Sequence, residues 1–236
     1  MHERINFNPY TVNIFTDSSV KNVACGFDSC SAVCTLLGDN VISSRAEINR
    51  GTTNNFGEMY AIYMGVCEAL QYIIHNTPVT CINLYSDSRI SVLGLKQWYK
   101  NWVLDSEGYL VGSTGRIANQ NLICSIINMI ITYKIKISFY HIKGHTNLNK
   151  QSEFEDFKIK FRTINGDIGP SLIEDEVFEK LIRYNDHVDT YSRNLLSKSQ
   201  NNMYNMKAII PVNKFCNFDK LDLDLYSKLI DPRYHF

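Results

Sequence analysis

The sequence has no excess of charge of either sign and no long apolar run. Lys and Arg together number 24 and Asp and Glu also number 24, so the formal net charge is zero. This balance counts against a nucleic-acid partner, which usually selects a basic protein, although a local basic groove can coexist with a neutral total. No apolar stretch approaches the roughly 20 residues that span a bilayer, so we expect no membrane partner.

Paired cysteines, repeats and a leader segment are also missing. The seven cysteines include no C-x-x-C pair, which offers neither a disulfide framework nor a zinc site and favours reduced thiols. The opening MHERINFNPYTVNIF lacks the basic segment and apolar run of a signal peptide. The apolar share of 44% is typical of ordinary globular proteins. Because the thiols are expected to be reduced and no signal peptide is visible, we expect the chain to be cytoplasmic.

What is present is a mixed α/β pattern that begins with strands. Apolar and β-branched runs predict strands, and Gly38-Asp39-Asn40 predicts a hairpin between the second and the third. The turn-forming Asp17-Ser18-Ser19 is expected to end the first strand. The predicted order is βββ-α-β-α-α-β, with strands at 11–16, 30–37, 41–48, 79–86 and 134–142 and helices at 56–75, 90–102 and 118–133.

The last third of the chain is less regular. Residues 147–170 are polar, with Asn-Gly and Gly-Pro breaks, and are typical of an insertion. Apolar residues then recur at intervals of three and four, which predicts a helix from about 171 to 196. The tail from 197 to 236 has weak periodicity, and its acids Asp219, Asp222 and Asp224 are typical of a solvated face.

Four acids fall at the ends of these elements. Asp17 ends the first strand and Asp87 ends the strand after the first helix, so parallel pairing would bring both to one edge of the sheet. Glu58 lies in the first turn of the intervening helix and Asp189 lies on the last helix. Any one of them alone could merely cap a helix or face solvent. Four gathered carboxylates repel each other unless hard divalent cations such as Mg²⁺ or Mn²⁺ bind between them.

Five motifs in order resemble those of the type 1 ribonucleases H of bacteria and phages, over residues 11–146 and then 185–196. The motifs are IFTDSS at 14–19 (family IFTDGS), TTNNFGEMYA at 52–61 (TNNxxE), LYSDSR at 84–89 (TDS), IKGHT at 142–146 (VKGH) and NDHVDTYSR at 185–193 (NxxCDxLA).

The resemblance implies a ribonuclease H-like fold of class α/β. Its central mixed five-stranded sheet has three antiparallel strands and then parallel strands, and helices flank it. The domain would span 1–196, with 147–184 as an insertion before the last catalytic helix and 197–236 as an extension. The implied activity is endonucleolytic hydrolysis of the RNA strand of RNA–DNA hybrids, leaving 5′-phosphate and 3′-hydroxyl ends. The enzyme would use two Mg²⁺ ions, or Mn²⁺ in their place, with no small-molecule cofactor, and would act as a monomer.

The same resemblance assigns the acids. Asp17 would bridge both metal ions, Glu58 and Asp87 would complete one metal site, and Asp189 the other. His145, on a mobile loop, would assist proton transfer or product departure, since imidazole titrates near neutrality.

Asp186 is the rival of Asp189. Asn185, Asp189 and Arg193 share one flank of the predicted helix at spacings of four, while Asp186 points to the other side. The motif alignment also selects Asp189.

On the substrate side, the resemblance places Asn54 and Asn55 at the minor groove of the hybrid, where an amide can read a ribose 2′-hydroxyl. Thr53 and Asn119 match positions that hold a phosphate of the DNA strand. Trp98 and Trp102, with Lys96 and Lys100, match the helix that leads into the family's hybrid-gripping protrusion. The alternative roles are a helix cap for the asparagines and core packing for Trp98.

The sequence also departs from the family pattern. Ser18 replaces the usual glycine after the first acid, and Arg89 replaces a glutamine, where it could bind phosphate. The protrusion reads VLDSEGYLVGSTGR and is not basic. Grip on the hybrid could then come from the tail or from cations of the 147–184 insertion, which are Lys150, Lys158, Lys160 and Arg162.

Two other classes of function stay open. Another nuclease of the same fold, a Holliday-junction resolvase or an integrase-like enzyme, would share the acids; a proofreading exonuclease would carry Asp-x-Glu where this chain has Asp17-Ser18-Ser19. A catalytically silent nucleic-acid-binding module would usually have lost one of the acids, and this sequence retains all four.

Overall fold

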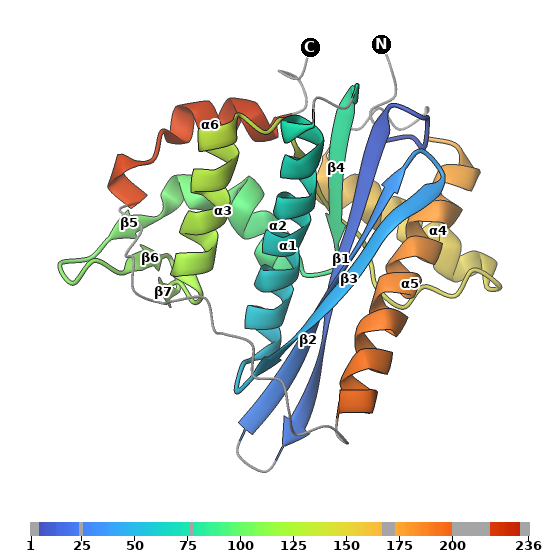
Figure 1. Ribbon diagram of the computed structural model, residues 1–236, viewed down its shortest axis with the longest axis horizontal. Helices are drawn as coiled ribbons and strands as arrows, with labels where there is room; N and C mark the ends of the chain where they lie inside the picture. The colour runs from blue at the N-terminus through green and yellow to red at the C-terminus, as the bar shows by residue number, and fades with distance from the viewer. Residues whose placement is uncertain (1–4, 24–25, 76–77, 167–172, 200–217, 232–236) are drawn as a thin grey trace.

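The structure is a computed structural model that describes residues 5–23, 26–75, 78–166, 173–199 and 218–231. Its centre is a five-stranded sheet with the strand order β3-β2-β1-β4-β8 (Figure 1). Strands β1, β2 and β3 are antiparallel, and β4 and β8 continue the sheet in parallel with β1. The predicted α/β class with a mixed five-stranded sheet is therefore confirmed. The strands are β1 Thr11–Val23, β2 Gly26–Leu37, β3 Asn40–Arg50, β4 Cys81–Ser86 and β8 Ser138–His141.

Helices cover both faces of this sheet (Figure 1). Side chains alternate along a strand, so Val12 and Ile14 of β1 pack into one hydrophobic core and Phe15 packs into the other. The first core lies under α1 Asn54–Ile74, α2 Arg89–Lys96, α3 Gln120–Tyr133 and α6 Leu223–Ile230. The second core lies under α4 Gln151–Asn165 and α5 Asp175–Lys198.

The first strand is longer than predicted. We expected it to end at Asp17, but β1 continues to Val23, because residues 18 to 23 pair with β2 in an antiparallel ladder. The expected turn was wrong because cross-strand pairing outweighs the local turn preference of Asp and Ser. Asp17 therefore lies within β1.

The helix expected over 90–102 is shorter, and the loop after it carries strands. Helix α2 ends at Lys96, and a single 3₁₀ turn follows at Trp98–Asn101. A small three-stranded sheet then forms from β5 Val103–Leu104, β6 Leu110–Gly112 and β7 Gly115–Arg116. This small sheet is the counterpart of the predicted protrusion.

The segment predicted as an irregular insertion contains a regular helix. Phe154, Phe157 and Phe161 of α4 lie on one face and pack against Tyr140 of β8 and Phe178 of α5. The helix predicted over 171–196 is α5, although residues 167–172 of the insertion lie outside the described residues.

The described part of the tail joins the core. The hydroxyl of Tyr226 donates to the backbone oxygen of Leu95 at 2.8 Å. The backbone N–H of Ile137 donates to the backbone oxygen of Leu229 at 3.1 Å. Phe218 and Ile230 are also buried. Helix α6 thus completes the core formed by α2 and α3. Within the described ranges, no helix has the length and apolar character needed to cross a bilayer.

Candidate active site

The candidate site lies where the parallel part of the sheet ends. Strands β1 and β4 pair in parallel up to Thr16 and Ser86. The next residues are Asp17, which lies within β1, and Asp87, which follows β4. Both carboxylates therefore lie where the parallel pairing ends, and the sequence predicted that they would be close together. Asp17 is buried and Asp87 is half-buried.

Glu58 reaches the same point from the first turn of α1. The side chain of Thr53 caps this helix by accepting from the backbone N–H of Phe56 at 3.2 Å. One oxygen from each of Asp17, Glu58 and Asp87 lies within 4.8 Å of the others. The buried Oε2 of Glu58 has no hydrogen-bond partner. A buried oxygen left unpaired in this way suits a bound cation.

Close packing of α1 on the sheet brings Glu58 to this position. A Cβ on Gly57 would lie 2.1 Å from Oγ of Ser18 and 2.9 Å from Cβ of Ser29. Ser18 of β1 stands where the family pattern has glycine. Because Gly57 of α1 has no side chain, there is room for the side chain of Ser18. The backbone N–H of Ser18 also donates to Oδ1 of Asp17 at 2.7 Å.

Asp189 approaches this group from α5, on the other face of the sheet. Its side chain is buried, and its charge raises the pKa of both Asp17 and Asp87. Arg193, one turn later on the helix, donates to its Oδ2 at 2.5 Å. Asp186 is half-buried, and its pKa is raised by burial and by the charge of Asp189. The geometry favours Asp189 over its rival, although Asp189 lies outside the 4.8 Å group.

Burial and mutual repulsion make the carboxylates reluctant to ionise. Burial, followed by the charges of Asp87 and Asp189, raises the pKa of Asp17 to about 8. Burial and the charges of Asp17 and Asp87 raise the pKa of Glu58 well above its usual value. Burial also raises the pKa of Asp87, against a lowering effect of His145. A divalent cation would remove both penalties, and an all-oxygen donor set with an unpaired Glu58 oxygen fits Mg²⁺ or Mn²⁺.

In EDTA, we expect the free energy of unfolding to fall as the pH rises. The pKa of Asp17 goes from an unfolded value of 3.8 to about 8 in the folded protein, so the folded state binds the additional proton. The stability that this proton contributes is fully present below the pKa of Asp17 in the unfolded protein. It is lost as the pH rises through the pKa of Asp17 in the folded protein. Urea denaturation between these limits measures the slope, which Asp17→Asn should reduce. A metal-free protein that gains stability over the same range would contradict the expectation.

The loop that follows β8 closes over the group. A Cβ on Gly144 would lie 2.4 Å from Oδ2 of Asp87, so only glycine fits there without displacing the carboxylate. His145 has a positive φ of 53° and a side chain that is 74% exposed. Its Nδ1 lies 3.6 Å from Oδ2 of Asp189. An exposed imidazole beside the acids can exchange protons with solvent and with a bound substrate.

The predicted substrate-side residues are exposed around the N-terminus of α1 and beyond β4. Thr53, Asn54 and Asn55 are all exposed, although Thr53 also caps the helix and Asn54 hydrogen-bonds Glu58. Arg89, the first residue of α2, is exposed, and Asn119 is half-buried before α3 with a left-handed φ of 58°. Each of them except Asn119 is thus available to a ligand lying along this edge without any rearrangement.

The family model for ribonuclease H matches residues 9–160. The chain belongs to the ribonuclease H family. Its enzyme class is therefore that of ribonuclease H, a nuclease and hydrolase. The match includes Asp17, Glu58, Asp87 and His145 and ends within α4, before the helix that carries Asp189. No curated protein sequence matches the chain.

Several solved structures are similar to this ribonuclease H. The protease–reverse transcriptase of prototype foamy virus matches at 14% identity and a TM-score of 0.45, over 69% of this chain and 21% of that one. LC11-RNase H1, solved in complex with an RNA/DNA hybrid, matches at 15% and 0.43, over 60% and 91%. RNase H1 of the halophilic archaeon Halobacterium salinarum matches at 14% and 0.41, over 56% and 86%. The chain thus spans about a fifth of the length of the viral protein.

Trp102, predicted to contact the substrate of this ribonuclease H, is buried in the core. Only 9% of it is exposed, because its ring packs beside Phe218 and against Gly94 and Gly112. The described tail thus covers the ring. The exposed tryptophan of this element is Trp98, at 41%.

The arginine of the protrusion and the four insertion cations that were expected to grip the substrate already have acidic or aromatic partners. Arg116 of the protrusion pairs with Asp105 and Glu107 and stacks on Tyr109 at 4.0 Å. On the insertion, Lys150 pairs with Glu153, and Lys160 pairs with Asp156. Lys158 pairs with both Glu155 and Asp175. The guanidinium of Arg162 lies over the ring of Phe178. Exposed ion pairs contribute little, so a phosphate can compete for Lys150 and Lys160, whereas Lys158 is buried.

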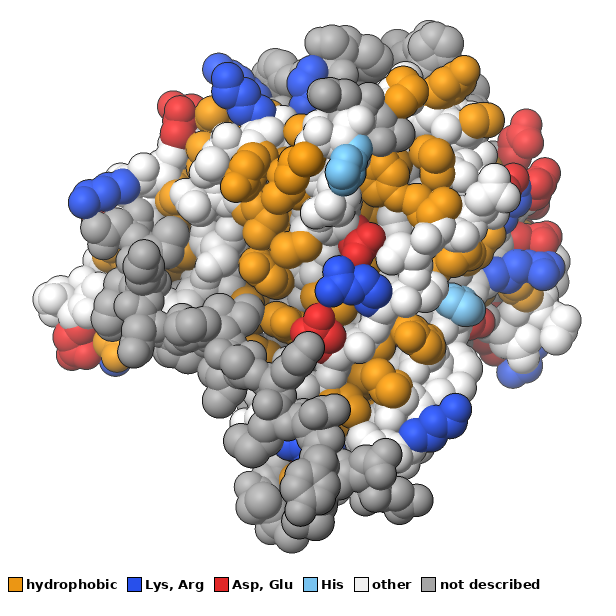
Figure 2. Space-filling model, in the orientation of Figure 1, with side chains coloured by type: hydrophobic (Ala, Val, Ile, Leu, Met, Phe, Trp, Pro, Cys, Tyr) orange, Lys and Arg blue, Asp and Glu red, His pale blue; other side chains and the backbone are white. Residues whose placement is uncertain are grey.

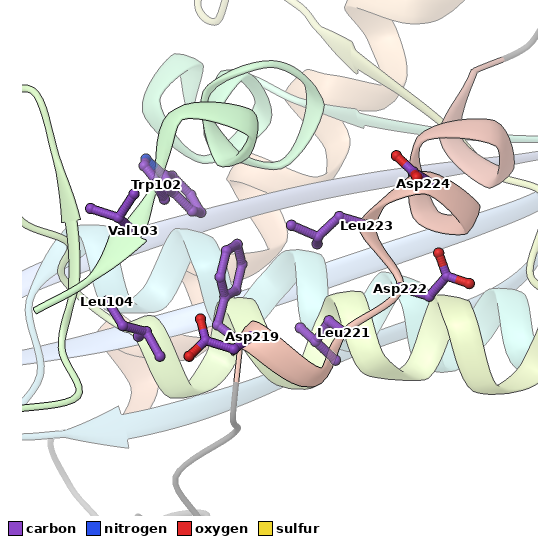
Figure 3. Close-up of a pocket in the computed structure, with 9 residues that line it drawn as sticks. Trp102, Val103, Leu104, Asp219, Leu221, Asp222, Leu223 and Asp224 are labelled. Atoms are coloured by element: carbon purple, nitrogen blue, oxygen red, sulfur yellow. The ribbon is translucent and has the colours of Figure 1, made fainter.

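Neither one visible face of the described residues (Figure 2) nor the groove beside the small sheet offers a basic platform. On the face shown in Figure 2, the Lys and Arg side chains of the described residues are scattered rather than gathered. An open groove of about 600 Å³ beside the small sheet has the apolar floor of Trp102, Leu104, Phe218 and Leu223 (Figure 3). Asp219, Asp222 and Asp224 line it and no Lys or Arg does, so it repels phosphate.

His145→Ala should slow turnover of this ribonuclease H without abolishing it. Proton transfer by a placed imidazole usually contributes on the order of 10²-fold or more, while the carboxylates remain intact in the variant. Single-turnover cleavage measures the rate, and His75→Ala, at the far end of α1, is the control. Undiminished turnover in His145→Ala would remove the histidine from the mechanism.

Sequence reasoning missed two residues that shape this site. Gly57 and Gly144 each lie next to a candidate functional residue in the motifs FGE and KGH. Their adjacency was the available signal, but the need for glycine depends on contacts that only the folded structure contains.

Proposed function

We propose that this ribonuclease H hydrolyses the RNA strand of RNA–DNA hybrids endonucleolytically, with two divalent cations held by Asp17, Glu58, Asp87 and Asp189. The observation that carries the proposal is the buried group of three carboxylates with an unpaired Glu58 oxygen. Its raised pKa values describe a site that costs free energy without cations. Asp17, whose pKa is raised by the charges of both Asp87 and Asp189, would be the ligand shared by the two cations.

The residues of the chain fix the geometry of the reaction. Bound cations would supply an activated water and stabilise charge on the leaving oxygen. Asp17 and Glu58 hold their oxygens on a rigid strand and a rigid helix, so little reorganisation is needed. His145 exchanges the proton associated with the leaving 3′-oxygen or assists departure of the product. Cleavage of the bond between phosphorus and O3′ leaves 3′-hydroxyl and 5′-phosphate ends.

Discrimination for RNA falls to the exposed residues around the edge. Asn54 and Asn55 each offer an amide that can both donate to and accept from a 2′-hydroxyl, the group that DNA lacks. Thr53 and Arg89 would contact phosphates from exposed positions, and Asn119 would do so from its half-buried position before α3. Because Arg116 of the protrusion and the cations of α4 already have partners, we expect specificity for the hybrid to come from these polar contacts more than from charge.

The arrangement of the chain fits one catalytic domain. We propose that residues 1–196 form it, including the insertion at 147–184, and that the 197–236 extension supports its core through α6. The domain would act as a monomer with Mg²⁺, or with Mn²⁺ in its place.

Substrate choice tests the proposal. Labelled RNA–DNA hybrid, duplex DNA, duplex RNA and a four-way junction are incubated with the protein and Mg²⁺, and the product ends are analysed. We expect cleavage of the RNA strand of the hybrid alone. Cutting of the junction without the hybrid would indicate a resolvase, and hybrid binding without cutting in Mg²⁺ or Mn²⁺ would indicate a silent binding module.

A further inference from the structure

A second histidine contacts the backbone of a candidate metal ligand. His141, the last residue of β8, is buried, and its Nε2 lies 3.1 Å from the backbone oxygen of Asp87. A carbonyl oxygen only accepts, so the ring must carry its proton on Nε2.

His141 is itself held by the insertion. Asn165, the last residue of α4, is buried and accepts from the backbone N–H of His141 at 2.8 Å. Its Nδ2 donates to the backbone oxygen of His141 at 2.7 Å and to that of Phe161 at 2.9 Å. The amide thus takes the place of a further strand on the open edge of the sheet.

Helix α4 is well anchored for this task. Its three phenylalanines pack between Tyr140 of β8 and Phe178 of α5. Lys96 of α2 donates to the backbone oxygen of Asn165 at 3.3 Å, which ties the end of α4 to the helix that follows Asp87. Contacts with β8, α2 and α5 therefore fix the end of α4.

Asp87 needs such support because the sheet no longer holds it. The parallel pairing of β4 with β1 ends one residue earlier, at Ser86. The imidazole of His141 donates to the backbone oxygen of Asp87. Asp17, by contrast, remains in the ladder between β1 and β2.

We propose that His141 and Asn165 are positioning residues that fix the backbone of Asp87 for metal binding, and that the insertion helix α4 thereby supports the metal site. The inference rests on the proposed function, in which Asp87 is a ligand. Partners that orient metal ligands typically contribute 10-fold to 100-fold in metal affinity.

Two substitutions of His141 separate positioning from packing. The amide nitrogen of Gln in His141→Gln can take the place of Nε2 and donate to Asp87, whereas Asn in His141→Asn is too short to do so. Mn²⁺ affinity is measured by titration calorimetry without nucleic acid, and the Mg²⁺ concentration for half-maximal hybrid cleavage is measured separately. We expect Mn²⁺ binding to weaken about 10-fold in His141→Asn and to stay within roughly threefold of the unchanged protein in His141→Gln.

Variants of α4 provide the second arm. Asn165→Asp keeps the acceptor for the N–H of His141 and loses the donor, so it should weaken Mn²⁺ binding less than Asn165→Leu. Thr163→Ala, an exposed position on the same helix, should change nothing. KM for the hybrid should stay constant throughout, because none of these side chains faces the substrate.

The outcomes are distinct. Equal Mn²⁺ affinity in His141→Gln and His141→Asn, with equal losses of Tm, would overturn the positioning role and leave only a packing role. If the unchanged protein cleaves no hybrid yet binds Mn²⁺ in a His141-dependent way, the proposed function fails and the positioning of Asp87 stands.

Discussion

Asp17→Asn should abolish cleavage of the hybrid while leaving the fold and hybrid binding intact. The charges of Asp87 and Asp189 both raise the pKa of Asp17, and we propose Asp17 as the ligand shared by both cations. The amide is nearly isosteric with the carboxylate but carries no charge. The stabilisation lost in a two-metal site amounts to several kcal/mol, so we expect a fall in rate on the order of 10³-fold or more.

Stability should move in the opposite direction. The substitution removes a buried carboxylate from among its like charges, so in EDTA near neutral pH the variant should have a higher Tm than the unchanged protein. Gel-based cleavage, hybrid binding by fluorescence anisotropy and thermal denaturation measure the three properties. This pattern differs from that of an ordinary destabilising substitution, in which activity and Tm fall together.

Asp186→Asn is the matched control. Asp186 is one turn from Asp189 on α5 but only half-buried, and the geometry assigns it no ligand role. Its variant should retain activity within roughly threefold, whereas Asp189→Asn should lose it. Near-normal turnover in Asp17→Asn, or loss of turnover in Asp186→Asn but not in Asp189→Asn, would contradict the assignment of the acids.

Gly57→Ala should destabilise the protein and displace Glu58. The added methyl group would lie 2.1 Å from Oγ of Ser18 and 2.9 Å from Cβ of Ser29, so α1 or β1 has to shift. Overpacking of this kind typically costs about 1–3 kcal/mol. Since Glu58 is the next residue of α1, the shift should also reduce the rate of cleavage.

The second change Ser18→Gly should recover much of both losses. Oγ of Ser18 is buried without a hydrogen-bond partner, so removing it sacrifices little. A double-mutant cycle by urea denaturation should give a clear coupling free energy between positions 18 and 57. Gly94→Ala is the control, because its Cβ meets Trp102 at an ordinary 3.4 Å and alanine favours a helix. Additive effects at 18 and 57 would show that the close contact does not limit α1.

The sheet and the carboxylate edge could be predicted because their signals are local. The strands are apolar and β-branched runs, and the parallel pairing of β1 with β4 brings Asp17 close to Asp87 without further information. The first helix was readable from its cap and its apolar face. The family motifs then placed the same acids in the same order, and the family match covers three of the four.

The errors arose where long-range contacts outweigh local preference. Asp17-Ser18-Ser19 resembles a turn, but pairing with β2 keeps it extended. Trp102 resembles a substrate contact until the distant Phe218 packs beside it. In α4, three phenylalanines at helical spacing stand among charged residues, so the periodicity was present but the overall polarity concealed it.

Asp17 and Asp87 differ in how firmly the backbone holds them. Asp17 lies inside a ladder that continues for six residues beyond it, so its amide should exchange with solvent slowly and its carboxylate should keep one position. Asp87 begins a connection to α2, and hydrogen bonds from outside its own strand restrain it. The two candidate ligands are thus fixed by different means, Asp17 by its own sheet and Asp87 through His141 by the helix α4. A substitution in α4 should therefore disturb Asp87 and leave Asp17 in place.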